Sequence, residues 1–177
     1  FQSFNRGKKS LTLNIATAEG QGIARELVGR CDVLIENYKV GDLKRYGLDY
    51  ESLRTIYPRL VYCSITGYGQ DGPYAEKPGY DFVFQGLVGL MSLTGEKGGG
   101  PVKPGLPVAD LTSGLWIAIA ILASLAGRAR TGKGCYVDFS MLDGQVALLT
   151  LAAARYFALN EVPPRLGTEP PGRVPSA

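Results

Sequence analysis

The pattern of apolar and polar residues marks four short segments with the character of β-strands. Residues 11–15 alternate strictly between the two types, which predicts a strand with one buried face. Residues 33–35 form a continuous apolar run instead, as expected of a parallel strand covered on both faces. Two further runs, residues 60–65 and 135–140, also have the length and composition of strands.

Apolar residues recur at helical spacing between these segments. The clearest case opens at Thr17, a favourable N-cap residue followed by an acidic first turn, and keeps one apolar face as far as Cys31. The other expected helices cover residues 40–47, 49–57, 80–93 and 141–159.

This succession of strands and helices predicts an α/β fold, a Rossmann-like parallel sheet with crossover helices. Ligands of such sheets bind beyond the carboxyl ends of the strands. The relevant ends here are Asn37–Tyr38 and residues 66–69. The glycine-rich loop of residues 67–79 is either a surface connection or a ligand-facing loop.

The longest apolar stretch follows Pro107 and contains one carboxylate near its start. Because proline cannot sit inside a helix, we expect Asp110 as the N-cap and Leu111 as the first helical residue. Nearly every residue from there to about Ala126 is apolar or small, which predicts a helix buried on all sides. The helix dipole favours the ionised form of Asp110. Asp110 is then either a helix cap only or a carboxylate nucleophile, and the spacing leaves both open.

Polar residues near the first strand end suggest a second element of a site. Asn37–Tyr38 is followed by Arg45, and a polar strand end beside an arginine suits a nucleotide or a phosphate. The alternative for Arg45 is a solvated position on the protein surface. Tyr80 is a further candidate polar residue.

The amino-acid composition limits the kinds of binding and catalytic site that the chain can contain. The chain has 177 residues, of which 45% are hydrophobic and 20% charged, as in globular domains. A net charge of +3 is too small to indicate nucleic-acid binding, although it suits an anionic ligand such as a phosphorylated cofactor. The lack of histidine excludes histidine bases and triads, and without a Cys-x-x-Cys pair no metal site is expected.

The cysteines and the lengths of the apolar runs provide evidence on the cellular compartment and on membrane association. Cys31, Cys63 and Cys135 lie far apart in apolar surroundings, so we expect buried free thiols in a reducing compartment, the cytoplasm or a mitochondrial or similar interior. No signal peptide is visible at the start. The longest apolar run, within residues 115–126, is shorter than the roughly 20 residues of a membrane span, so no membrane partner is expected.

Four segments taken together are more specific than any one of them. They are Phe4-Asn5-Arg6-Gly7-Lys8-Lys9-Ser10, Asp32-Val33-Leu34-Ile35-Glu36-Asn37-Tyr38, residues 64–74 and Arg130-Thr131-Gly132-Lys133-Gly134. This set strongly resembles class III CoA-transferases, the family of formyl-CoA and carnitine-CoA transferases that also contains α-methylacyl-CoA racemase. Residues 101–105 with Asp110 look most like the dicarboxylate members, such as succinate–hydroxymethylglutarate CoA-transferase.

The resemblance covers essentially the whole chain and lacks the family's first segment and C-terminal half, so a fragment is expected. It implies part of the large domain of an interlocked homodimer, in which two ring-like chains thread through each other. Residues 1–140 would form the CoA-binding and catalytic region, and residues 141–177 a helix and the start of a linker. Such a piece alone would expose apolar surface meant for missing strands and for a partner chain.

The resemblance also implies a reaction. Asp110 would be the nucleophile that passes CoA from an acyl-CoA donor to a carboxylic acid, expected to be dicarboxylic, through a mixed anhydride and an aspartyl-CoA thioester. The CoA thioester is then a substrate, and no permanently bound cofactor is expected. By the same matching, the residues that line the CoA site are Leu13, Asn37, Tyr38 and Arg45, and Tyr80 faces the acyl group.

Two alternative functions stay open. In the racemase branch, a histidine stands where this chain has Tyr80 and works with the aspartate to exchange an α-proton. Tyrosine titrates at about pH 10 and is a poor base at neutral pH, which favours CoA transfer over racemisation. A non-catalytic CoA-binding protein that kept the fold is the other alternative.

Overall fold

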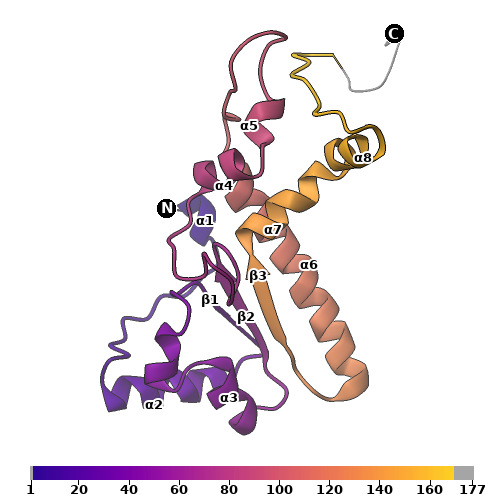
Figure 1. Cartoon of the computed structure of the whole chain (residues 1–177). Coiled ribbons are helices and arrows are strands. Elements are labelled where there is room, and N and C mark those ends of the chain that lie inside the picture. The colour runs from indigo at the N-terminus through magenta and orange to yellow at the C-terminus, as the bar shows by residue number, and fades with distance from the viewer. Residues whose placement is uncertain (1, 170–177) are drawn as a thin grey trace.

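Three parallel strands form the centre of the structure, with helices around them (Figure 1). In the computed structural model, which describes residues 2–169, the strands are β1 (Val33–Glu36), β2 (Val61–Thr66) and β3 (Tyr136–Ser140). Their order in the sheet is β1-β2-β3, with Leu34 opposite Tyr62 and Cys63 opposite Val137. The expected α/β fold with a parallel sheet is confirmed.

Two helices pack on the sheet face that carries Leu34 and Tyr62. After the short α1 (Gln2–Asn5), α2 (Ala18–Gly29) begins at Thr17, whose hydroxyl accepts from the backbone N–H of Gly20. A 3-10 helix, η1 (Asp42–Tyr46), precedes α3 (Tyr50–Ile56), which is capped by Asp49. The buried side chains between these helices and the sheet are Val28, Leu53, Leu60 and Tyr62.

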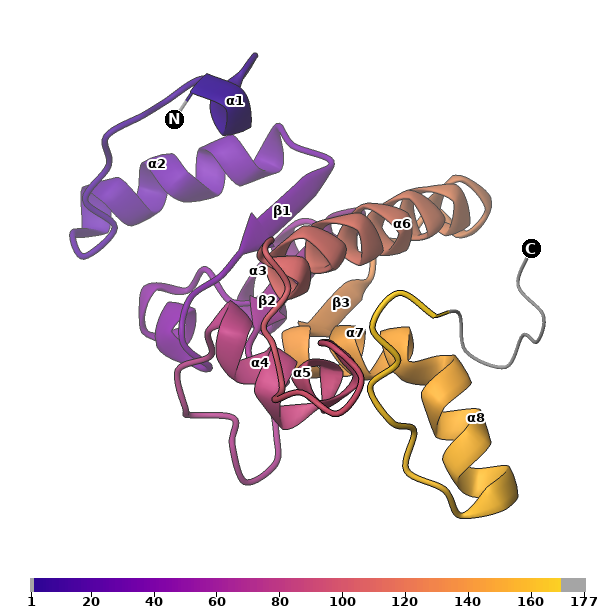
Figure 2. The same ribbon diagram turned by 90° about the horizontal axis from the view of Figure 1, so that it is seen from above.

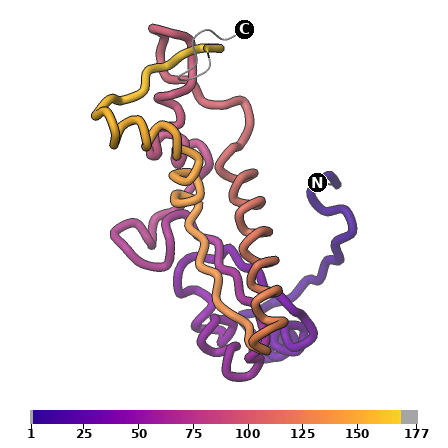
Figure 3. The backbone as a smooth tube through the Cα atoms, turned by 90° about the vertical axis from the view of Figure 1, so that its right-hand side faces the viewer, coloured from indigo at the N-terminus to yellow at the C-terminus, as the bar shows by residue number. Residues whose placement is uncertain are grey.

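The longest helix, α6 (Val108–Thr131), runs beside β2 and β3 (Figures 1 and 3). It begins directly after Pro107, so Asp110 lies within the first turn, and the expectation that Asp110 is the N-cap is wrong. A backbone N–H at the start of a helix has no hydrogen-bond partner within the helix. Proline, which has no N–H, therefore precedes the first turn without the loss of a helical hydrogen bond. The helix ends at Gly132, where a φ of +73° turns the chain away.

The expectation that this helix is buried on all sides is also wrong. The buried residues of α6 are Ala109, Ser113 and Ile117, whereas Leu115 and Leu122 are exposed. With β2, β3 and the helices α4 (Asp81–Leu87) and α7 (Met141–Val146) against it, the described part of the chain covers one side of α6.

The hydropathy of α6 also differs from the expectation based on residues 115–126 alone. By length and composition alone the helix could cross a membrane, and most of its apolar stretch is exposed in the described part of the chain. In the structure it packs against β2, β3, α4 and α7, as the core helix of a folded domain does.

Two expected helices are interrupted. The segment 80–93 divides into α4 and α5 (Leu90–Leu93), because Gly89 between them has a φ of +87° that a helix cannot continue through. The segment 141–159 divides into α7, a 3-10 turn η2 (Ala147–Leu149) and α8 (Thr150–Leu159). The turn redirects the chain, and α8 extends away from the sheet (Figure 2).

Residues 11–15 form no strand, contrary to the expectation. They lie in the connection before α2, and the described sheet contains no strand that pairs with them. An alternating pattern becomes a strand only where a neighbouring strand takes up its backbone hydrogen bonds. The expected boundary after residue 140 falls at the junction of β3 and α7, and residues 170–177 of the expected linker lie outside the described residues.

Candidate active site

A cavity of about 350 Å³ lies at the carboxyl ends of all three strands. Asn37 and Tyr38 follow the end of β1, Thr66 and Gly67 come from the end of β2, and Met141 follows β3. This is the position at which parallel sheets bind ligands, because the loops that leave the strands diverge there.

Four of the six predicted site residues line this cavity, namely Asn37, Tyr38, Tyr80 and Asp110. Asn37 is held by its side-chain amide, which donates to the carbonyl of Ile65 at 2.6 Å and so ties the end of β1 to β2. Leu13 lies half-buried before α2, and Arg45 lies on η1 with its guanidinium 3.5 Å from Asp42. Neither of these two residues lines the cavity.

The glycine-rich loop of residues 67–79 closes on itself beside the cavity. A Cβ atom on Gly79 would lie 2.1 Å from Cζ of Phe84, and one on Gly67 would lie 3.1 Å from Cα of Gly79. Only glycine permits this approach of the two loop ends. Residues 75–79 line the cavity, so this half of the loop faces the candidate ligand site.

Asp81, which the sequence analysis did not single out, holds the start of α6. Its Oδ1 accepts from the backbone N–H of Ala109 at 2.7 Å and from that of Asp110 at 3.2 Å. The first N–H groups of a helix lack partners within the helix, and Pro107 supplies no side-chain acceptor. Asp81 therefore caps α6 from another element. It lies 28 positions before Ala109 in the sequence, so no local pattern indicates the contact.

The environment of Asp110 opposes its ionisation. Burial, and then the charge of Asp81, raise the pKa of Asp110 above its ordinary value. The helix dipole acts on the Asp110 carboxyl in the opposite direction to burial and the charge of Asp81. The side chain stays exposed enough to meet a ligand in the cavity.

The cysteines offer no competing nucleophile in this cavity, since none of them lines it. All three are free, but only Cys63 is buried; Cys135 is partly buried and Cys31 is exposed, so the expectation of three buried thiols is wrong. Cys31 follows the last turn of α2, at the edge of the described fold. Burial, followed by the charges of Glu36 and Asp138, raises the pKa of Cys63 to about 11, so its thiol stays protonated at neutral pH.

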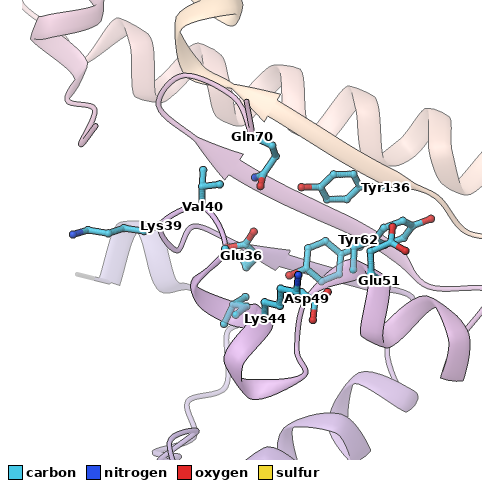
Figure 4. Close-up of a pocket in the computed structure, with 12 residues that line it drawn as sticks. Glu36, Lys39, Val40, Lys44, Asp49, Glu51, Tyr62, Gln70 and Tyr136 are labelled. Carbon is cyan, nitrogen blue, oxygen red and sulfur yellow. The ribbon is translucent and has the colours of Figure 1, made fainter. Parts of the chain in front are cut away.

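A second cavity, of about 270 Å³, lies on the other side of the segment after β1 (Figure 4). Lys39 and Val40 line both cavities, so this segment separates them. The rings of Tyr50 and Tyr136 stack in its wall with centroids 4.9 Å apart, and Gln70 lies near Tyr136. None of the predicted site residues lines this second cavity, so the candidate active site is the cavity that contains Asp110.

Among residues 2–169, no group of three or more acidic or cysteine side chains is arranged to hold a metal ion.

Comparison with known proteins agrees with this picture. The sequence model of the family described as CoA-transferase family III matches residues 1–177. The chain is 46% identical over 175 residues to a succinate–glutarate CoA-transferase of Agrobacterium fabrum, covering 99% of the chain and 44% of that protein. It is also 46% identical over 175 residues to the succinyl-CoA:glutarate CoA-transferase of Mus musculus, covering 99% of the chain and 40% of that protein. The chain thus spans less than half the length of these relatives.

Solved structures show the same fold. A CaiB/BaiF family protein from Brucella suis superposes with a TM-score of 0.91 at 49% sequence identity, over 97% of this chain and 45% of that one. The protein Rv3272 from Mycobacterium tuberculosis superposes with a TM-score of 0.80 at 31% identity, over 86% of this chain and 42% of that one.

Proposed function

The chain belongs to CoA-transferase family III, and from this premise we propose that its protein transfers CoA from an acyl-CoA donor to a dicarboxylic acid, with Asp110 as the nucleophile. The observation that carries the proposal is the position of Asp110. It is a carboxylate at the start of a core helix that faces a cavity at the strand ends, beside Asn37, Tyr38 and Tyr80.

The proposed reaction alternates between a carboxylate and a thiolate. Asp110 attacks the acyl carbonyl of the donor thioester, which gives a mixed anhydride and releases CoA thiolate. The thiolate attacks the aspartyl carbonyl, forms an aspartyl-CoA thioester and releases the donor acid. The acceptor carboxylate attacks this thioester, forms a second mixed anhydride and releases CoA thiolate. The thiolate then attacks the acceptor acyl carbonyl of the anhydride, which gives the acceptor CoA thioester and frees the carboxylate of Asp110. Each step exchanges one anion for another, so no proton transfer and no histidine is needed.

Two properties of the site support this role. Asp81 binds the backbone N–H groups of Ala109 and Asp110, so the first turn of α6 is fixed while the side chain of Asp110 remains accessible. The raised pKa of Asp110 belongs to a more basic carboxylate, which is a better nucleophile when ionised.

The substrates are proposed from the relatives and from the charges around the cavity. The relatives act, by name, on succinate and glutarate, and a further relative from Acetobacter aceti is an acetyl-CoA:oxalate CoA-transferase. Lys39 and Lys77 line the cavity and offer cations to an anionic substrate. Asn37 and Tyr38 would contact CoA and Tyr80 the acyl group, whereas Leu13 and Arg45, outside the cavity, would reach only the more distant nucleotide.

The assembly is proposed to be the interlocked homodimer of the family, in a reducing compartment such as the cytoplasm. The apolar face of α6, with Leu115 and Leu122, and the exposed Phe157 of α8 are uncovered in the described chain. Such surface is normally covered by further protein. The second copy and the remainder of the protein would bury it.

Trapping of the acyl-enzyme tests the proposal. The whole protein is incubated with succinyl-CoA and glutarate, quenched with hydroxylamine and digested, and mass spectrometry locates the hydroxamate. We expect it on Asp110, and we expect Asp110→Asn to abolish both the hydroxamate and CoA transfer. Asp71→Asn, which changes an exposed aspartate outside the cavity, is the matched control and should keep both. A hydroxamate on another residue, or α-deuterium uptake without CoA exchange, would contradict the proposal.

A further inference from the structure

We propose that Gln85 is a positioning residue of this active site: its side-chain amide holds Asp81 in the orientation that fixes the first turn of α6, and with it Asp110. The inference rests on the proposed function of Asp110. It adds a residue that touches neither the cavity nor the reacting atoms.

The contact between Gln85 and Asp81 is short, and it joins a fully buried amide to a partly buried carboxylate. Gln85 lies on α4 with no exposed surface, and its Nε2 donates to Oδ2 of Asp81 at 2.6 Å. A carboxylate can only accept, so the nitrogen of the amide must face it. Oδ2 of Asp81 is thereby directed at Gln85, which leaves Oδ1 for the N–H groups of Ala109 and Asp110.

The other end of the Gln85 amide shows that packing alone does not explain the residue. Its Oε1 is buried and has no hydrogen-bond partner among residues 2–169. An unpaired buried carbonyl is unfavourable, and a leucine of similar size would fill the same space without that penalty. The amide is therefore explained by what its nitrogen does: it binds Asp81 at 2.6 Å and makes a longer contact of 3.5 Å to the carbonyl of Leu106.

A second glutamine provides an internal comparison. Gln145 on α7 is also fully buried against α6, and its Oε1 also lacks a partner among the described residues. Its Nε2 donates to the hydroxyl of Thr112 at 2.7 Å and not to a carboxylate. Gln145 is thus matched to Gln85 in type and burial, and each lies on a helix that packs against α6, but Gln145 lacks the connection to Asp81.

The charged and titratable groups around the pair are few. Tyr80 precedes α4, and Asp110 faces Asp81 from α6. The remaining titratable groups that line the cavity are Tyr38, Lys39, Glu76 and Lys77, whereas α7 contributes the uncharged Met141. The acid limb of the pH–rate profile would therefore report the titration of Asp110, whose pKa is raised by burial and by the charge of Asp81.

The test compares four whole proteins: wild type, Gln85→Leu, Gln85→Glu and Gln145→Leu. In Gln85→Leu, Asp81 loses a charge-assisted hydrogen bond and can move relative to Asp110, so we expect a fall in kcat of about tenfold and an acid limb displaced from its wild-type position. The KM for acyl-CoA should change less than about twofold, since Gln85 does not line the cavity. Gln145→Leu should lower the melting temperature comparably but leave kcat and the pH profile as in wild type.

Gln85→Glu supplies a response that a purely structural role would not produce. At low pH the introduced carboxyl is protonated and can donate to Asp81, so activity should be close to that of wild type. At higher pH both carboxylates ionise at hydrogen-bond distance and repel each other. We expect a new loss of activity on the alkaline side, which is absent from the wild type.

Several results would overturn the inference. Folded Gln85→Leu and Gln85→Glu proteins with the wild-type kcat and pH profile would do so, as would loss of folding in both of them with Gln145→Leu intact. Carbodiimide labelling of Asp110 at a series of pH values, located by mass spectrometry, gives a readout without turnover. The pH at which labelling falls should shift in Gln85→Leu and not in Gln145→Leu. If the wild type transfers no CoA, the proposed function fails. The labelling experiment then still tests, without turnover, whether Gln85 positions Asp81 and Asp110.

Discussion

Replacement of Asp81 tests how the start of α6 is held. Asp81→Ala removes the acceptor of two backbone N–H groups in the first turn. The two are not equivalent, because Ala109 is fully buried whereas Asp110 is exposed. The N–H of Asp110 can turn to water in the variant, and the N–H of Ala109 cannot.

The magnitude follows from this difference. A buried N–H without an acceptor costs about 1–3 kcal/mol, and loss of a helix cap costs about 0.5–2 kcal/mol. Both figures describe the same lost contacts and do not add, so we expect Asp81→Ala to destabilise the protein by about 2 kcal/mol. In Asp81→Asn an oxygen remains to accept from Ala109, and Gln85 can turn its amide so that its unpartnered Oε1 accepts from the new amide. The loss there should be about 1 kcal/mol, since a neutral hydrogen bond is weaker than a charge-assisted one.

Hydrogen exchange measures this effect at the site itself. Exchange of the whole protein followed by mass spectrometry resolves peptides that cover the first turn of α6. We expect protection there to fall strongly in Asp81→Ala and weakly in Asp81→Asn, with the urea midpoint following the same order. Asp71→Ala, an exposed loop aspartate, is the control. Equal protection in Asp81→Ala and Asp71→Ala would refute the reasoning that Asp81 caps the helix.

Three further predictions test other parts of the structure. The pKa of Asp110 is raised in the folded state, so the ionised side chain destabilises the fold above that pKa. Asp110→Asn should therefore have a higher melting temperature than wild type at about pH 7. The difference should vanish below about pH 3.9, where the aspartate is neutral in both the folded and the unfolded state. Gly79→Ala places a methyl group against Phe84, so it should lower the free energy of unfolding by about 1–3 kcal/mol and raise KM. Gly105→Ala is the control: a Cβ atom there would lie in open space, so its free energy of unfolding in urea should be nearly that of wild type. Arg128 donates to the carboxylate of Asp32 at 2.7 Å and to the carbonyl of Arg59 at 3.0 Å, so Arg128→Ala should cost about 1–2 kcal/mol, and an unchanged urea midpoint would contradict this.

Features that depend on a few neighbouring residues could be predicted from the sequence. Thr17 and Asp49 cap their helices as the local pattern indicates, and Gly132 ends α6 through its left-handed conformation. The position of the site could also be predicted, because the rule that ligands bind at the carboxyl ends of parallel strands needs only the strand order. Asn37 and Tyr38 were found in this way, and the structure places both in the cavity with Asp110.

Features that depend on distant partners could not be predicted. Residues 11–15 have the alternation of a strand but no neighbouring strand among the described residues, and α6 has the composition of a fully buried helix but is covered on one side. The break at Gly89 has a local cause, yet an isolated glycine in an apolar helical pattern is as often tolerated. In each case the composition of a segment permits a certain secondary structure and burial, and contacts with the rest of the fold determine which of them the segment adopts.

The carboxylate at the start of α6 combines both situations. Its presence near the start of an apolar helix is a local fact that leaves a helix cap and a nucleophile both open, and the resemblance to the family is what implies the nucleophile. Its chemistry is set by Asp81, which comes from α4 and has two opposed effects on it. Through the backbone, Asp81 stabilises the first turn that carries Asp110; through its charge, it makes Asp110 harder to ionise. A neutral capping residue would provide the first effect without the second. The choice of an acid at position 81 therefore gives the proposed nucleophile a fixed backbone and a more basic carboxylate at the same time.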